Sequence, residues 1–120
     1  MKKYVTSLLF RSTVAFITLN SCIALAGTGN AVHYHDKYQG KKTANGEVFD
    51  QNKLTAAHNK FPYGSQVKVT NLANNQSVIV KINDRMAQHN QNIIDVTKHA
   101  AKKLGFLGKG RAQVSLEQIR

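Results

Sequence analysis

Three acidic side chains, Glu47, Asp50 and Asp84, are the main candidates for chemistry in this sequence. The chain has only six acidic residues, and Glu47 and Asp50 lie three positions apart, just after the turn-forming pair Asn45-Gly46. Cleavage of a glycosidic bond needs a carboxylic acid that protonates the leaving oxygen. It commonly needs a second carboxylate that stabilises positive charge on the sugar or acts as a base. A catalytic carboxylate pair is therefore one hypothesis, and solvated loop acids are the simpler alternative.

The other ionisable residues have plainer explanations. Asp95 precedes a predicted helix, where an Asp is favoured as a local hydrogen-bond acceptor. Asp36 and Glu117 lie near the two ends of the chain and are interpreted as ordinary surface charges. His33 and His35 are spaced to share one face of a strand, but two ligands do not complete a zinc site. We therefore expect no metal and no cofactor.

The apolar pattern predicts the elements that must position these acids. Short strands are expected at residues 67–72, 77–84, 93–96 and 112–119. The first two form a hairpin across Ala73–Gln76, which places Asp84 at the end of a strand. Thr97 is expected to cap a short helix that Gly105 ends. Many short strands with one small helix indicate a mainly β protein, a small β-barrel.

Two segments have weaker patterns. Residues 27–31 are expected to form a short polar leader, followed by a first strand within residues 32–39. Residues 53–63 are expected to be irregular, with at most one helical turn capped by Thr55.

The first 26 residues have the layout of a secretory signal peptide. Three basic residues, Lys2, Lys3 and Arg11, precede the uncharged run at residues 12–26, and Ala24-Leu25-Ala26 provides a small-residue cleavage site. The domain division is therefore a signal peptide at residues 1–26 and one domain at residues 27–120, exported to the periplasm or beyond the cell. Lipidation of Cys22, with a lipid anchor, is the alternative.

The charge of the chain fits either polyanionic surroundings or a surface that lysines make soluble. The sequence has 17 basic and six acidic residues, and removal of residues 1–26 takes away three basic residues, which leaves a net charge of +8. An exported basic protein meets anionic wall polymers and lipid head groups. Export argues against a nucleic-acid partner, and no stable membrane span is expected after cleavage.

The order of the motifs resembles the rare lipoprotein A family. The matching runs are TANGEVFD, then LTAAHNKFPYGSQVKVTNLANNQSVIVKINDR, then IIDVTKHAAKKLG, which together lie within residues 31–119. The resemblance implies a six-stranded double-psi β-barrel with one or two short helices. It also implies a peptidoglycan lytic transglycosylase that cuts between N-acetylmuramic acid and N-acetylglucosamine, on strands without stem peptides, and leaves 1,6-anhydro ends.

The resemblance also assigns roles to residues of this chain. Asp84 of NDR becomes the leading catalytic acid/base, Glu47 its partner carboxylate across a groove, and Asp50 a supporting acid. His58 of TAAH, with Asn83 and Arg85 of NDR, is implied to bind the sugar. The run after Arg85 departs from the family, which often reads NDRGPF where this chain reads NDRMAQHNQN.

Two other function classes compete with the enzyme. A non-catalytic module that binds or loosens wall polysaccharide, as the related expansins do, predicts binding without a sugar product. A secreted basic protein that acts on membranes predicts leakage of lipid vesicles.

Overall fold

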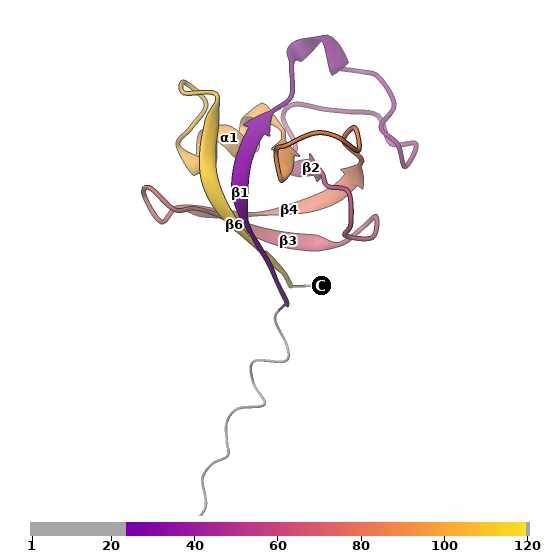
Figure 1. The fold of residues 1–120 in the computed structure, drawn as a ribbon. Helices are drawn as coiled ribbons and strands as arrows, with labels where there is room; N and C mark the ends of the chain where they lie inside the picture. Colours follow the sequence, from indigo (N-terminus) through magenta and orange to yellow (C-terminus); the bar gives the residue numbers. More distant parts are fainter. Residues whose placement is uncertain (1–23, 120) are drawn as a thin grey trace, which may run out of the picture.

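The computed structural model describes residues 24–119, which form a closed six-stranded barrel (Figure 1). The elements are β1 (Ala24–His33), η3 (Asp36–Tyr38, a 3-10 helix), β2 (Thr55–Ala57), β3 (Gln66–Asn71), β4 (Ser77–Asp84), β5 (Ile94–Val96), α1 (Lys98–Leu104) and β6 (Arg111–Gln118). The prediction of a six-stranded double-psi β-barrel with one or two short helices is confirmed. Residues 1–23 of the expected signal peptide lie outside the described residues.

The strand order around the barrel is β1-β5-β2-β4-β3-β6. Two pairs are parallel, β1 with β5 and β2 with β4, and the remaining pairs are antiparallel. Parallel neighbours need a long connection between them. The barrel therefore brings together residues that are far apart in the sequence.

The barrel interior is filled by the alternate residues of its strands. On β3 and β4 the buried apolar side chains are Val67, Val69, Val80 and Ile82, as expected when one face of each strand points inward. The same core cluster contains Ala100, Ala101 and Leu104 of α1. Without a disulfide, this apolar burial is the main source of stability.

The strongest local signals in the sequence are confirmed. The predicted hairpin is formed by β3 and β4, and its turn contains Asn75 at a positive φ of 62°. Thr97 caps α1, because its Oγ1 accepts a hydrogen bond from the Ala100 amide over 3.3 Å. Gly105 ends the helix at a φ of 81°, a conformation that glycine adopts without strain.

Two expectations about the elements are wrong. The first strand already begins at Ala24 and includes the expected polar leader, since β1 continues its pairing with β6 past an irregularity near Gly27. Residues 55–57 form a buried strand rather than a helical turn. Thr55, Ala56 and Ala57 are small enough to lie between β4 and β5, which pair with both edges of β2.

The β1–β2 connection, residues 34–54, folds against one end of the barrel. In Figure 1 this purple segment lies beside the end of β4. Tyr34 and Phe49 anchor it in a second apolar cluster with Ala57, against which Met86 packs. Among the described residues, we find no helix with the length and apolar character needed to cross a membrane.

Candidate active site

Asp84, the last residue of β4, accepts three hydrogen bonds through its carboxylate. Oδ1 accepts from the backbone amides of Ala44 and Arg85 over 2.8 and 2.9 Å, and Oδ2 accepts from the Tyr34 hydroxyl over 2.6 Å. All three contacts use the carboxylate as an acceptor, which matches an ionised Asp. Burial, followed by the hydrogen bond to Asp84, raises the pKa of Tyr34, so this hydroxyl remains a donor.

A bulge in β4 sets the position of Asp84. Ala56 of β2 pairs with Ile82, but the next residue, Ala57, pairs with Asp84, so Asn83 is the extra residue. Bulges of this kind occur next to active sites and change the direction of a side chain. The end of β4 is thereby matched to Ala57, the last residue of β2.

Asp95 of β5 lies on the other side of Ala57. Ala57 pairs with Asp84 on β4 and with Asp95 on β5. Since adjacent strands are about 4.8 Å apart, the Cα atoms of the two acids are separated by roughly 10 Å. Both acids line one cavity of about 350 Å³, together with Tyr34, Tyr38, Lys42 and residues of the β4–β5 connection.

The surroundings of Asp95 favour its neutral form. Burial, and next the negative charge of Asp84, raise the pKa of Asp95 to about 7. Within the described part of the chain, its buried Oδ1 has no hydrogen-bond partner. The expectation that Asp95 is a local hydrogen-bond acceptor is therefore wrong, and Thr97 caps the helix instead.

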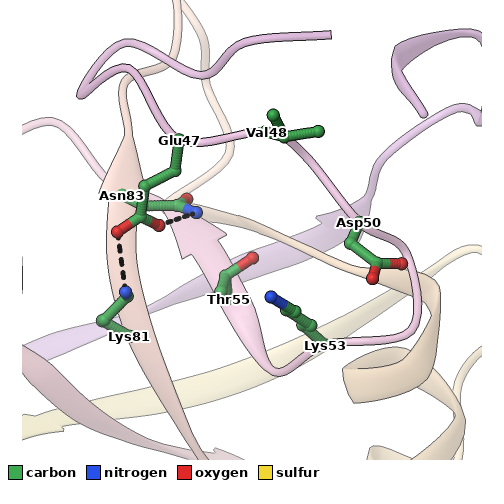
Figure 2. Close-up of a pocket in the computed structure, with 7 residues that line it drawn as sticks. All are labelled: Glu47, Val48, Asp50, Lys53, Thr55, Lys81 and Asn83. Carbon is green, nitrogen blue, oxygen red and sulfur yellow. Dashed lines mark hydrogen bonds and ion pairs between the residues drawn. The ribbon is translucent and has the colours of Figure 1, made fainter. Parts of the chain in front are cut away.

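Glu47 and Asp50 line a different cavity, of about 330 Å³ (Figure 2). Glu47 Oε2 lies 2.8 Å from Lys81 Nζ, and Glu47 Oε1 accepts from Asn83 Nδ2 over 3.1 Å. These hydrogen bonds, that of Lys81 first, lower the pKa of Glu47. Glu47 is thus held in place by Lys81 and Asn83.

Asp50 is also held by its own segment. Its Oδ1 accepts from the Asn52 amide over 3.0 Å and from Gln39 Nε2 over 3.4 Å. The Asn52 contact is the main cause that lowers the pKa of Asp50. Figure 2 shows Lys53 between Asp50 and Glu47 in this cavity, which therefore carries both signs of charge.

Glu47 and Asp84, which were expected to face each other across one groove, line two different cavities. The cavity with Glu47 contains Lys81 and Asn83, whereas the cavity with Asp84 contains Asp95. At the register shift, Asn83 donates to Glu47, whereas Asp84 pairs with Ala57. Glu47 and Asp84 nevertheless both connect the loop at residues 44–47 to the end of β4. Asp84 accepts from the Ala44 amide, and Glu47 accepts from Asn83. The Asn45 amide also donates to the Asn83 carbonyl over 3.2 Å.

His58 is buried and fixes a turn. Its Nδ1 accepts from the amides of Lys60 and Phe61 over 3.0 and 3.1 Å, and its ring stacks on Phe61 at 4.3 Å. Burial, followed by the positive charges of Arg85 and Lys60, lowers the pKa of His58. It lines a third cavity, of about 440 Å³, and Met86 lines both this cavity and the one with Asp84.

Arg85 connects the two segments around these cavities. Its Nη1 donates to the His58 carbonyl over 2.8 Å, and its guanidinium lies 4.0 Å from the centre of the Tyr63 ring. It also lines the cavity with Asp84. Asn83, by contrast, is 3% exposed and belongs to the cavity with Glu47. Among residues 24–119, no group of three or more His, Cys, Asp or Glu side chains is arranged to hold a metal ion.

Reasoning from the sequence missed Tyr34 and Asp95 as members of the site. The signal available for Asp95 was its place in a short apolar run, IIDV, where a charged residue is costly to bury. Nothing local to Tyr34 indicates its contact with Asp84. Both residues enter the site through pairing between distant strands.

Comparisons with known proteins agree with this barrel and its motifs. Residues 26–116 match the model of the family described as "Lytic transglycolase". The chain is 49% identical over 100 residues to the endolytic peptidoglycan transglycosylase RlpA of Neisseria meningitidis serogroup A, covering 83% of this chain and 42% of that protein. It is 43% identical over 104 residues to the protein of the same name from Pseudomonas aeruginosa strain PAO1, covering 87% and 30%. The chain thus spans less than half the length of these curated relatives.

Solved structures of lower identity share the fold. The Streptomyces papain inhibitor superposes with a TM-score of 0.63 at 20% identity, covering 80% of this chain and 97% of that one. An expansin of Clavibacter michiganensis gives 0.62 at 20% identity, covering 78% and 50%. The family match over residues 26–116 covers most of the sequence, and the chain belongs to the lytic transglycolase family.

Proposed function

We propose that this chain is a lytic transglycosylase that cleaves the glycan strand of peptidoglycan between N-acetylmuramic acid and N-acetylglucosamine. The observation that carries the proposal is the cavity at the end of β4 and β5, where two carboxyl groups with different surroundings lie on either side of Ala57. Protonation of a glycosidic oxygen needs one neutral carboxyl, and stabilisation of the sugar cation needs one ionised carboxylate. The curated relatives named as transglycosylases support the same reaction.

In this mechanism an acid protonates the glycosidic oxygen as its bond to C1 breaks. The C6 hydroxyl of the muramic acid then closes onto C1 and gives up its proton to a carboxylate, so that a 1,6-anhydro end forms without water. Asp84 is the catalytic carboxylate that we assign with most support, because three donors fix its position. Strands that lack stem peptides are the proposed substrate.

The remaining predicted site residues receive supporting roles. Glu47 positions the loop that donates the Ala44 amide to Asp84, through its contacts with Lys81 and Asn83. Asp50 lies beside Glu47 in the same cavity. Their cavity does not include Asp84, so we do not assign either residue a proton transfer.

His58 and Arg85 shape the wall of the sugar groove. The bond from Arg85 to the His58 carbonyl ties the end of β4 to the turn after β2. Export of the chain fits this substrate, since the layout of residues 1–26 is that of a signal peptide. The name of the relatives supports cleavage within strands.

The test is product analysis on peptide-free glycan strands. The purified protein is expected to release 1,6-anhydro-ended sugars, detected by mass spectrometry. Asp84→Asn is expected to lower the release by at least about 100-fold, the range of general acid–base catalysis, while the fold is retained. Sedimentation with isolated sacculi but no soluble product would instead support the non-catalytic wall-binding function.

A further inference from the structure

We propose that Asp95 is the proton donor of the cleavage step, and that Asp84 is its ionised, charge-stabilising partner. The inference rests on the proposed function and divides the roles within the same site. It replaces the pairing of Asp84 with Glu47 that the sequence suggested.

The geometry of the sheet makes Asp95 the carboxyl opposite Asp84. Both residues pair with Ala57, from the two strands that flank β2, and both line the same cavity. Ala57 carries only a methyl group, so no larger side chain of β2 separates the two acids. Glu47 lies in the neighbouring cavity with Lys81 and Asn83.

The two carboxyl groups differ in their hydrogen bonds. Asp84 accepts from the Tyr34 hydroxyl and from two backbone amides. In residues 24–119 we find no hydrogen bond to the side chain of Asp95, and its buried Oδ1 is without a partner. A buried carboxyl oxygen without a donor disfavours the charged form of Asp95, whereas three donors fix the position of the Asp84 carboxylate.

The other charged and titratable groups around the cavity do not remove the difference between Asp84 and Asp95. Asp84 faces Asp95 from β4, and its charge opposes ionisation of Asp95. Tyr34 and Tyr38 line the cavity from the β1–β2 connection, and Lys42 lines it from the same connection. Arg85, the remaining cation of this cavity, donates to the His58 carbonyl and stacks on Tyr63.

These assignments give a balanced reaction. Asp95 transfers its proton to the glycosidic oxygen, which keeps the electron pair of the broken bond to C1. The Asp84 carboxylate stabilises the positive charge that develops at C1. The C6 hydroxyl oxygen then bonds to C1, and its proton passes to the ionised Asp95. Both acids return to their starting forms, and no water is consumed.

The first experiment compares Asp95→Asn with Glu117→Gln, a matched acid-to-amide change on β6 away from the cavity. Release of anhydro-ended sugars from peptide-free glycan strands is expected to fall at least about 100-fold in Asp95→Asn and to remain at the wild-type rate in Glu117→Gln. A wild-type rate in Asp95→Asn overturns the inference, while the activity itself still supports the proposed function.

The second experiment follows the carboxyl carbons of 13C-labelled aspartates by NMR between pH 3 and 9. One aspartate is expected to titrate near pH 7 in the wild type, to be missing in Asp95→Asn, and to titrate at lower pH in Asp84→Asn, where the neighbouring charge is gone. This result does not depend on activity, so an inactive wild type contradicts the proposed function alone. An Asp95 carboxyl that titrates below pH 5 in the wild type overturns the inference even if Asp95→Asn does not fold.

Discussion

The Tyr34 hydroxyl donates a hydrogen bond to Oδ2 of Asp84 over 2.6 Å, although the two residues lie 50 positions apart in the chain. The contact joins the end of β1 to the end of β4. The Tyr34 ring is also held by packing on Phe49, because the centres of the two rings lie 4.3 Å apart. The orientation of the Asp84 carboxylate is therefore set by the closed barrel and by the segment that follows β1.

We predict that Tyr34→Phe lowers the cleavage rate about tenfold and leaves the fold intact. The phenyl ring keeps the packing on Phe49, but Asp84 loses one of its three donors, and a hydrogen bond to a charged group contributes about 1.5–3 kcal/mol. The measurement is the rate of anhydro-product release, with a urea unfolding curve for each protein. Tyr63→Phe is the matched control, since Tyr63 is 44% exposed and does not line this cavity. Equal rates in the two variants would contradict the role of the Tyr34 hydroxyl.

We predict that burial of Asp95 makes the protein less stable at pH 8 than an equivalent protein without this acid. The pKa of Asp95 is raised from 3.8 to about 7 in the folded state, so the folded protein binds more protons than the unfolded chain between these values. The stability linked to this proton is complete below pH 3.8 and is lost as the pH rises through about 7. The loss is at most about 4 kcal/mol, from 1.36 kcal/mol per pH unit.

The check is the difference in unfolding free energy between Asp95→Asn and the wild type at pH 5 and pH 8. Other titrating groups contribute equally to both proteins and cancel in this difference. Asp95→Asn is expected to gain stability relative to the wild type as the pH rises. A difference that is constant between the two pH values would show that Asp95 titrates normally.

We predict that Glu47 stabilises the protein through Asn83 more than through Lys81. The pair of Glu47 and Lys81 is about two-fifths exposed on each side, and such pairs contribute at most about 1 kcal/mol. Asn83 is 3% exposed, so loss of its acceptor leaves a buried amide donor unpaired, at a cost of about 1–3 kcal/mol. Glu47→Ala should therefore be more destabilising than Lys81→Ala in urea unfolding.

Glu47→Gln separates these two contributions. A glutamine retains a carbonyl oxygen that can accept from Asn83, but it removes the charge that pairs with Lys81. Its unfolding free energy is expected to lie near that of Lys81→Ala. A loss as large as that of Glu47→Ala would assign the stabilisation to the charge pair instead.

We predict that His58→Ala destabilises the protein by about 2–4 kcal/mol, because two backbone amides lose their acceptor and the stacking on Phe61 is removed. His58→Asn is expected to recover part of this loss, since an Asn side-chain oxygen can accept from an amide two residues later. Thermal unfolding of both variants at pH 8 measures the effect. Equal melting temperatures in the wild type and His58→Ala would contradict it.

Local patterns predicted the parts of the fold that local chemistry determines. The β3–β4 hairpin follows from alternating apolar residues and a turn rich in Asn, and α1 follows from the cap at Thr97 and the stop at Gly105. The strand β2 was missed because Thr55-Ala56-Ala57 is too short to show alternation. Its strand form depends on β4 and β5, which lie far from it in the sequence.

The candidate site was predicted only in part for the same reason. Asp84 could be chosen as a candidate because it ends a recognisable strand and lies within a family motif. The resemblance assigned the partner role to Glu47, and the sequence does not reveal the irregularity at Asn83 or that Glu47 and Asp84 line different cavities. Asp95 was interpreted as a helix-start residue, and its burial beside Asp84 arises only when β5 pairs with β2.

The position of Ala57 between two acids has a mechanical consequence. The backbones of Asp84 and Asp95 are separated by two inter-strand spacings of one hydrogen-bonded sheet. Their separation is therefore as rigid as the sheet itself. The segments that line the cavity, including residues 85–93, can then change in length or composition and admit a different polymer. The distance between the two acids stays the same. In such a protein, the choice of substrate and the ability to cut it are controlled by separate parts of the chain.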